Sequence, residues 1–99
     1  MDDSLHPTVT DPEFYQVVFE NDKVRVVELR DVPGARTRRH RHPDSVLITL
    51  SAFRRRMTTD GNTVEVDRAP FEAGWMAGLT HVGENVGDTP THVLFVEIK

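Results

Sequence analysis

Short apolar runs separated by turn signals are the feature that most restricts the fold of this chain. From Tyr15 onward, turn-forming residues recur roughly every 8–12 residues, and no helical period of apolar residues is present. This spacing is typical of an all-β sandwich or barrel. The strongest turn signal is Asp60-Gly61-Asn62, which favours a tight hairpin. We expect strands over Phe14–Glu20, Val24–Leu29, Arg36–His42, Ser45–Ser51, Phe53–Thr58, Val64–Asp67, Phe71–Ala77, His81–Glu84 and His92–Ile98.

The length of the chain indicates one domain with one modest core, because it has only 99 residues. Residues 1–13 contain Pro7 and Pro12 and little apolar pattern. We therefore expect an N-terminal arm over residues 1–13, which includes His6, followed by a β-barrel domain over residues 14–99.

Composition and charge exclude several classes of function. A net charge of −4 argues against a general nucleic-acid-binding protein. No apolar run approaches the ~20 residues that span a bilayer, so we expect no membrane partner. The first residues, MDDSLHPTVTDPEF, are unlike a secretory signal. The chain has no cysteine, which excludes disulfides and thiolate metal sites and is compatible with the cytoplasm, where we expect the protein.

Two of the five histidines stand one residue apart in the segment GARTRRHRH, residues 34–42. In a strand, alternation places His40 and His42 on one face, with Cα atoms about 7 Å apart, and turns the intervening Arg41 to the other face. Two imidazoles in this arrangement can bind one metal ion. A basic surface strand that happens to carry histidine is the alternative, and the spacing alone does not decide between them.

The wider pattern around these histidines resembles the first motif of the cupin superfamily, G-x5-H-x-H-x3or4-E-x6-G. Gly34, His40 and His42 match its first half in full. The motif glutamate, which is usually the fourth metal ligand, is missing, because Val46 and Leu47 occupy its two possible positions. The site that this resemblance implies therefore lacks its carboxylate.

A second segment resembles the second cupin motif, G-x5-P-x-G-x2-H-x3-N. Gly78, His81 and Asn85 fall in register with it. The match is looser at its start, where Met76 stands at the proline position and Pro70 at the leading glycine. The resemblance extends over roughly residues 17 to 99 and is to the small single-domain cupins.

The resemblance implies an all-β, single-domain jelly-roll barrel in which His40, His42 and His81 hold one divalent transition metal. Three histidines suit iron, zinc, nickel or copper, so they do not identify the metal. Asp44 is a candidate to replace the missing glutamate, although Pro43-Asp44 is more typical of a turn. Without a carboxylate ligand, the charge of the metal is uncompensated and should favour an anionic oxygen ligand.

Several other residues are candidates for the wall of a substrate pocket. Trp75 precedes His81 and could stack on a substrate, or could be the main aromatic residue of the core. Met76 is a pocket candidate or a core filler. Phe53 is expected in the core or lining the pocket, as is Phe71.

These observations leave three functional hypotheses. The first is a small metalloenzyme acting on an anionic or chelating organic substrate, either as a dioxygenase or as an isomerase or lyase; three-histidine cupins include dioxygenases of thiols and diketones. The second is a non-catalytic cupin that binds or senses a small molecule. The third is a structural barrel whose histidines hold no metal. A homodimer is expected, because a chain of 99 residues gains stability from an added apolar interface.

Overall fold

The computed structural model describes residues 4–99, in which nine strands and one short helix make up the regular structure. No helix in this part of the chain is long and apolar enough to cross a membrane. The elements in chain order are α1 (Pro7–Thr10), β1 (Tyr15–Glu20), β2 (Val24–Asp31), β3 (His40–His42), β4 (Ser45–Thr49), β5 (Phe53–Thr59), β6 (Asn62–Arg68), β7 (Ala73–Met76), β8 (Leu79–Asn85) and β9 (Thr91–Ile98).

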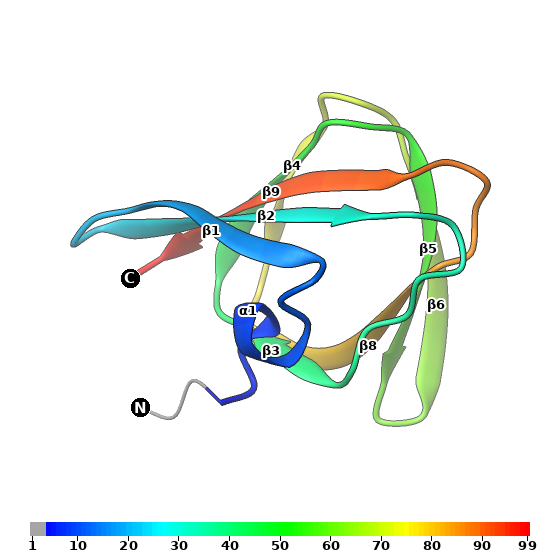
Figure 1. Cartoon of the computed structure of the whole chain (residues 1–99), viewed down its shortest axis with the longest axis horizontal. Helices are drawn as coiled ribbons and strands as arrows, with labels where there is room; N and C mark the ends of the chain where they lie inside the picture. The colour runs from blue at the N-terminus through cyan, green and yellow to red at the C-terminus, as the bar shows by residue number, and fades with distance from the viewer. Residues whose placement is uncertain (1–3) are drawn as a thin grey trace.

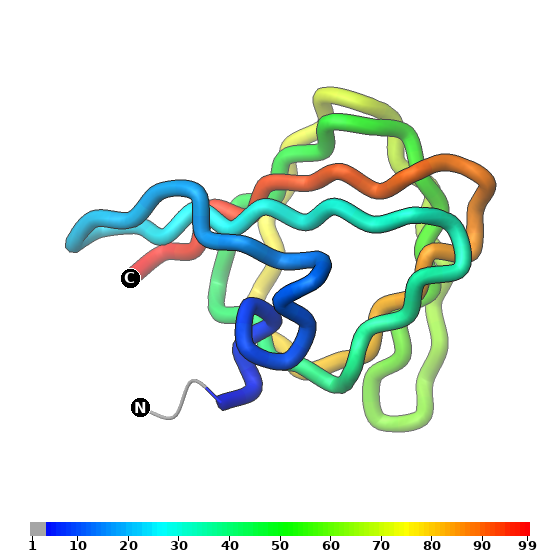
Figure 2. Tube along the Cα trace, viewed as in Figure 1, coloured from blue at the N-terminus to red at the C-terminus, as the bar shows by residue number. Residues whose placement is uncertain are grey.

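The strands form two antiparallel sheets that enclose the interior of the molecule (Figure 1). The larger sheet has the order β1-β2-β9-β4-β7 and the smaller one the order β3-β8-β5-β6. Non-consecutive neighbours, such as β2 with β9 and β3 with β8, bring distant parts of the sequence together, as the chain trace shows (Figure 2). The predicted jelly-roll architecture is therefore confirmed, although the two sheets do not close into one continuous ladder.

The hairpin between β5 and β6 forms where the sequence predicts it. Asp60 and Gly61 both have positive φ, of 48° and 80°, which is the backbone that a tight two-residue hairpin turn requires. Thr59 and Asn62 close the ladder on either side of the turn.

Strand alternation builds the core between the sheets. In β9, every second side chain from Thr91 to Glu97 is buried, and the intervening ones are partly exposed. The buried apolar residues of the core come from β9 and from three other strands, β1, β2 and β5. They are Tyr15, Val27, Leu29, Phe53, Val93 and Phe95. This apolar cluster lies beside the histidines described below, since Phe95 stacks on His42.

The third predicted strand is shorter than expected. The pattern predicts a strand over Arg36–His42, but regular pairing begins only at His40, and Arg36 makes an isolated bridge. The cause lies in the N-terminal segment, because the backbone N–H of Arg38 donates to a carboxylate oxygen of Asp11 at 2.9 Å instead of to a strand.

The prediction for Phe71 is wrong in both place and burial. Its φ of 63° breaks an extended backbone, so β7 begins only at Ala73. Its side chain is 85% exposed and belongs neither to the core nor to the pocket lining.

The described part of the predicted arm lies against the barrel. His6 and Asp11 are buried, and Nε2 of His6 lies 2.7 Å from a carboxylate oxygen of Glu97 in the last strand. The backbone N–H of Arg41 donates to the carbonyl of Leu5 at 2.7 Å, which ties this segment to β3. Residues 1–3 of the arm lie outside the described residues, and the division of the chain at residue 13 stays a prediction.

Candidate metal centre

Strand pairing brings the three predicted histidines together. β3 and β8 are antiparallel neighbours, and His40 lies directly opposite His81 in their ladder. His42 is two residues farther along β3, so it projects from the same face as His40. All three side chains are buried, and one ring nitrogen from each lies within 4.8 Å of the others.

The rings meet edge to face rather than in a stack. Their centroids are 4.6 to 5.0 Å apart, and each pair is close to perpendicular. Nε2 of His40 and Nε2 of His42 are 2.9 Å apart, whereas Nδ1 of His42 is buried with no hydrogen-bond partner among the described residues. Hydrogen bonds within the cluster therefore do not satisfy all of its nitrogens, as expected of residues arranged to bind a cation.

Two aromatic side chains hold the imidazoles in place. Tyr15 packs edge-on against His40 at a centroid distance of 5.4 Å, and Phe95 stacks on His42 at 4.9 Å. Neither ring can move without disturbing the apolar core, so the convergence of the nitrogens is built into the packing.

Burial keeps the three histidines neutral. Desolvation is the largest cause in each case: it lowers the pKa of His81 to about 4 and the pKa of His42 well below its usual value. The pKa of His40 is also lowered by burial, although the nearby Asp11 carboxylate opposes this change. Neutral imidazoles present lone pairs, so all three residues are in the protonation state that metal binding needs at neutral pH.

A cavity of about 270 Å³ lies next to the cluster, and His42 and His81 form part of its wall. Its remaining lining is largely apolar and includes all three predicted pocket residues, Trp75, Met76 and Phe53. Phe53 is buried, whereas Trp75 is 61% exposed and is therefore not a central core aromatic. The structure thus brings the predicted pocket residues and two of the histidines around one space, while their roles in substrate binding stay a prediction.

Asp44 does not join the cluster. It is exposed, and its carboxylate accepts a hydrogen bond of 2.7 Å from the backbone N–H of Gly78. It therefore braces the connection between β7 and β8, and the alternative in which it replaces the motif glutamate receives no support from the geometry. Of the two residues at the glutamate positions, Leu47 lines the cavity.

Sequence reasoning missed three buried charged groups near the cluster, Arg55, Asp31 and Asp11. Arg55 lines the cavity and is paired with Asp31, whose other oxygen accepts a hydrogen bond from Asn85. Strand alternation could have identified Arg55, since it shares a face with Phe53 and Met57. No local signal could have identified Asp11, whose carboxylate reaches His40 from the N-terminal segment.

Comparisons with known proteins agree with this architecture. Neither a protein-family model nor a curated protein matches the chain. Among solved structures, a cupin domain from Bordetella pertussis Tohama I is similar at 28% identity and a TM-score of 0.79, over 86% of this chain and 91% of that one. A Cupin_2 domain of an XRE family transcriptional regulator from Enterobacter cloacae is similar at 19% identity and a TM-score of 0.58, over 86% of this chain and 95% of that one.

A further likeness is to a protein described as a predicted oxalate decarboxylase from Thermotoga maritima. It is 15% identical, with a TM-score of 0.59, over 86% of this chain and 79% of that one. At this identity the likeness concerns the fold alone. The chain therefore has the cupin fold, with a possible three-histidine metal site inside it. This follows from the order of the strands, from the pairing of β3 with β8 and from the likeness to the solved cupin domains.

Proposed function

We propose that the protein is a small metal-binding cupin in which His40, His42 and His81 hold one divalent transition metal. The observation that carries this proposal is the convergence of three buried, neutral imidazoles with no carboxylate among them. Such a donor set suits iron, zinc, nickel or copper. When bound, the metal would act as a Lewis acid and, if redox-active, as a centre for dioxygen chemistry.

We further propose that the protein is a metalloenzyme for a small anionic or chelating organic molecule. Three neutral ligands leave the charge of a divalent metal uncompensated, which favours an anionic group on the ligand. The cavity beside His42 and His81 is small and largely apolar, so the rest of the molecule should be compact and apolar. In this arrangement Trp75, Met76 and Phe53 would contact the body of the ligand and exclude water from it.

Elemental analysis tests the metal site first. Purified, untagged wild-type protein should carry near one equivalent of a transition metal, and His40→Ala should lose it. Iron, copper or nickel would direct the search to dioxygen-dependent cleavage, and zinc to isomerisation, elimination or hydrolysis. No metal in the wild type, even after reconstitution, would favour a barrel whose histidines are purely structural.

The alternative is a cupin that binds or senses a small molecule without turning it over. One observation favours it: a similar Cupin_2 domain belongs to a transcriptional regulator. Metal-loaded protein should be incubated with a panel of small carboxylates, thiols and diketones and followed by mass spectrometry. Consumption that is lost in His81→Ala supports the enzyme, whereas saturable binding with recovery of the unchanged molecule supports the sensor.

A homodimer in the cytoplasm is part of this proposal. The edge strand β1 exposes Val17, Val18 and Phe19, which a partner copy could cover. Light scattering should give about twice the monomer mass of 11.3 kDa. A monomer mass would contradict the dimer, and recovery in a secreted or membrane fraction would contradict the location.

A further inference from the structure

The N-terminal segment reaches the metal cluster from outside the two cupin motifs. Helix α1 lies beside β3 (Figure 1). The segment is fixed at both ends, because Leu5 accepts a hydrogen bond from the backbone of Arg41 and Asp11 accepts one from the backbone of Arg38. Its position relative to His40 is therefore set by backbone contacts to β3 and to the residues that precede it.

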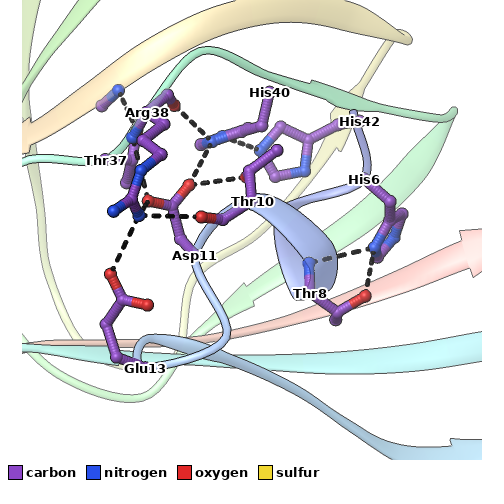
Figure 3. Close-up of polar contacts among 10 residues, drawn as sticks. His6, Thr8, Thr10, Asp11, Glu13, Thr37, Arg38, His40 and His42 are labelled. Atoms are coloured by element: carbon purple, nitrogen blue, oxygen red, sulfur yellow. Dashed lines mark hydrogen bonds and ion pairs between the residues drawn. The ribbon is translucent and has the colours of Figure 1, made fainter. Parts of the chain in front are cut away.

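Asp11 is a buried carboxylate at the end of this segment. It is 0% exposed, and one of its oxygens lies 3.4 Å from Nδ1 of His40 (Figure 3). The same oxygen accepts a hydrogen bond of 2.7 Å from the hydroxyl of Thr10. The guanidinium of Arg38 is 3.6 Å from the other oxygen, but that arginine side chain is largely exposed. Burying a carboxylate costs free energy unless the group is hydrogen-bonded or paired. His40 is a buried group beside Asp11 that a negative charge can stabilise.

The two nitrogens of His40 face different partners. Nδ1 donates to the carbonyl of Arg38 at 3.1 Å and lies beside Asp11, whereas Nε2 faces His42 at 2.9 Å (Figure 3). A proton held on Nδ1 leaves the lone pair on Nε2 directed into the cluster. A carboxylate behind a ligating histidine fixes its tautomer and raises its basicity, and its loss commonly costs about 10–100-fold in metal affinity.

We propose that Asp11 is a positioning residue of the metal centre, which orients His40 and favours the tautomer in which Nε2 is left to bind the metal. This inference rests on the proposed metal-binding function. It also makes the N-terminal segment a working part of the site, so that the site is built from three separate stretches of the chain rather than from the two motifs alone.

The test compares Asp11→Asn with Glu13→Gln in the full-length protein. Both variants remove one carboxylate from the same segment, but Glu13 is exposed, and the one ion pair of its carboxylate among the described residues is with Arg38, at 3.5 Å. Dissociation constants for Zn²⁺ and Co²⁺ are measured by competition with a chromophoric chelator, at a temperature where circular dichroism shows all variants folded. We expect Asp11→Asn to weaken binding about 10–100-fold and Glu13→Gln to change it less than about threefold.

The Co²⁺ absorption spectrum separates positioning from a merely structural role. A change in the d–d bands of Asp11→Asn, at saturating Co²⁺, would report altered ligand geometry.

If Asp11→Asn does not fold, NMR of the wild type can still overturn the proposal. Nitrogen shifts of the zinc-loaded protein should show His40 protonated at Nδ1 and bound through Nε2; the opposite tautomer would overturn the proposal. Equal metal affinities for wild type, Asp11→Asn and Glu13→Gln would also overturn it while leaving the metal site intact. Failure of the wild type to bind either metal would instead overturn the proposed function.

Discussion

Acid should destabilise the metal-free protein well above the pH at which its carboxylates titrate. The perturbation is protonation of the buried histidine cluster. Burial lowers the pKa of His81 from 6.5 to about 4, so the unfolded chain takes up a proton in this range and the folded chain does not. The unfolded state therefore binds more protons, and the free energy of unfolding falls as the pH falls from 6.5 toward 4.

The size of this effect follows from the same values. One pKa unit corresponds to about 1.4 kcal/mol, so lowering the pKa of His81 from 6.5 to about 4 makes this histidine alone cost about 3 kcal/mol once the pH is below 4. His40 and His42 add to the loss, because burial lowers the pKa of each of them as well. Glu28 contributes to the loss of stability only at lower pH, because the hydrogen bond from His92 lowers the pKa of its carboxyl below the usual 4.5.

Urea unfolding of chelator-treated protein at several pH values between 7.5 and 5 measures the effect before the carboxylates contribute. We expect a loss of at least about 2 kcal/mol over this range and a shallower slope for His81→Gln, which has no imidazole to protonate. Comparing slopes rather than absolute values removes any constant effect of the substitution. This prediction would be wrong if the unfolding free energy of the wild type were constant across the range, or if an NMR titration of His81 were centred near 6.5.

Three further substitutions test other parts of the structure. Asp31→Asn should cost about 3–5 kcal/mol in urea unfolding, because it leaves the buried guanidinium of Arg55 without its carboxylate; a loss below about 1 kcal/mol would contradict this. Trp75→Ala should change stability by less than about 1 kcal/mol, because the side chain is 61% exposed, and the intrinsic fluorescence of this single tryptophan should respond to Cu²⁺ or to a ligand in the cavity. Leu47→Glu should destabilise the metal-free protein by burying a carboxylate but tighten metal binding, which calorimetry would measure in both states.

The β-structure could be predicted from the sequence because it is encoded locally. Alternation and turn residues indicate where strands start and stop, and each of the nine predicted segments contains one of the observed strands or most of it. The Asp60-Gly61 turn is the clearest case, since two residues determine the connection between β5 and β6. The pairing of β3 with β8 joins residues that are far apart in the sequence, so the local pattern does not predict it. The resemblance to the cupin motifs implied that the histidines of these two strands meet.

The errors arose where tertiary contacts override the local pattern. Arg36–His42 alternates like a strand, but a carboxylate from Asp11 takes up the backbone N–H of Arg38 and interrupts the ladder. Phe71 is apolar and next to a strand, yet its backbone N–H donates to the carbonyl of Thr49, its φ is positive, and its side chain is turned out to solvent. Neither competing interaction is visible in the neighbouring sequence.

In the candidate site, too, some residues could be predicted from the sequence and one could not. His40, His42 and His81 could be predicted because the resemblance to the two cupin motifs implies that they converge, and the structure brings them together on neighbouring strands. Asp11 could not, because a single acidic residue in a proline-containing segment carries no signal of where that segment packs. A buried partner on a separate stretch of chain is visible only in the folded structure.

The placement of charge around the cluster has a consequence for ligand binding. Leu47 contributes no charge inside the cavity, and Asp11 acts only through the ring of His40, so a bound divalent ion would keep most of its charge facing the cavity. A neutral ligand gains little from that charge, whereas an anionic one gains much in a largely apolar space. Because binding free energies are reciprocal, an anion that binds more tightly to the metal-loaded protein must also tighten the metal. Metal affinity measured with and without a small carboxylate should therefore differ, and Leu47→Glu, which supplies the carboxylate from the protein itself, should abolish the difference.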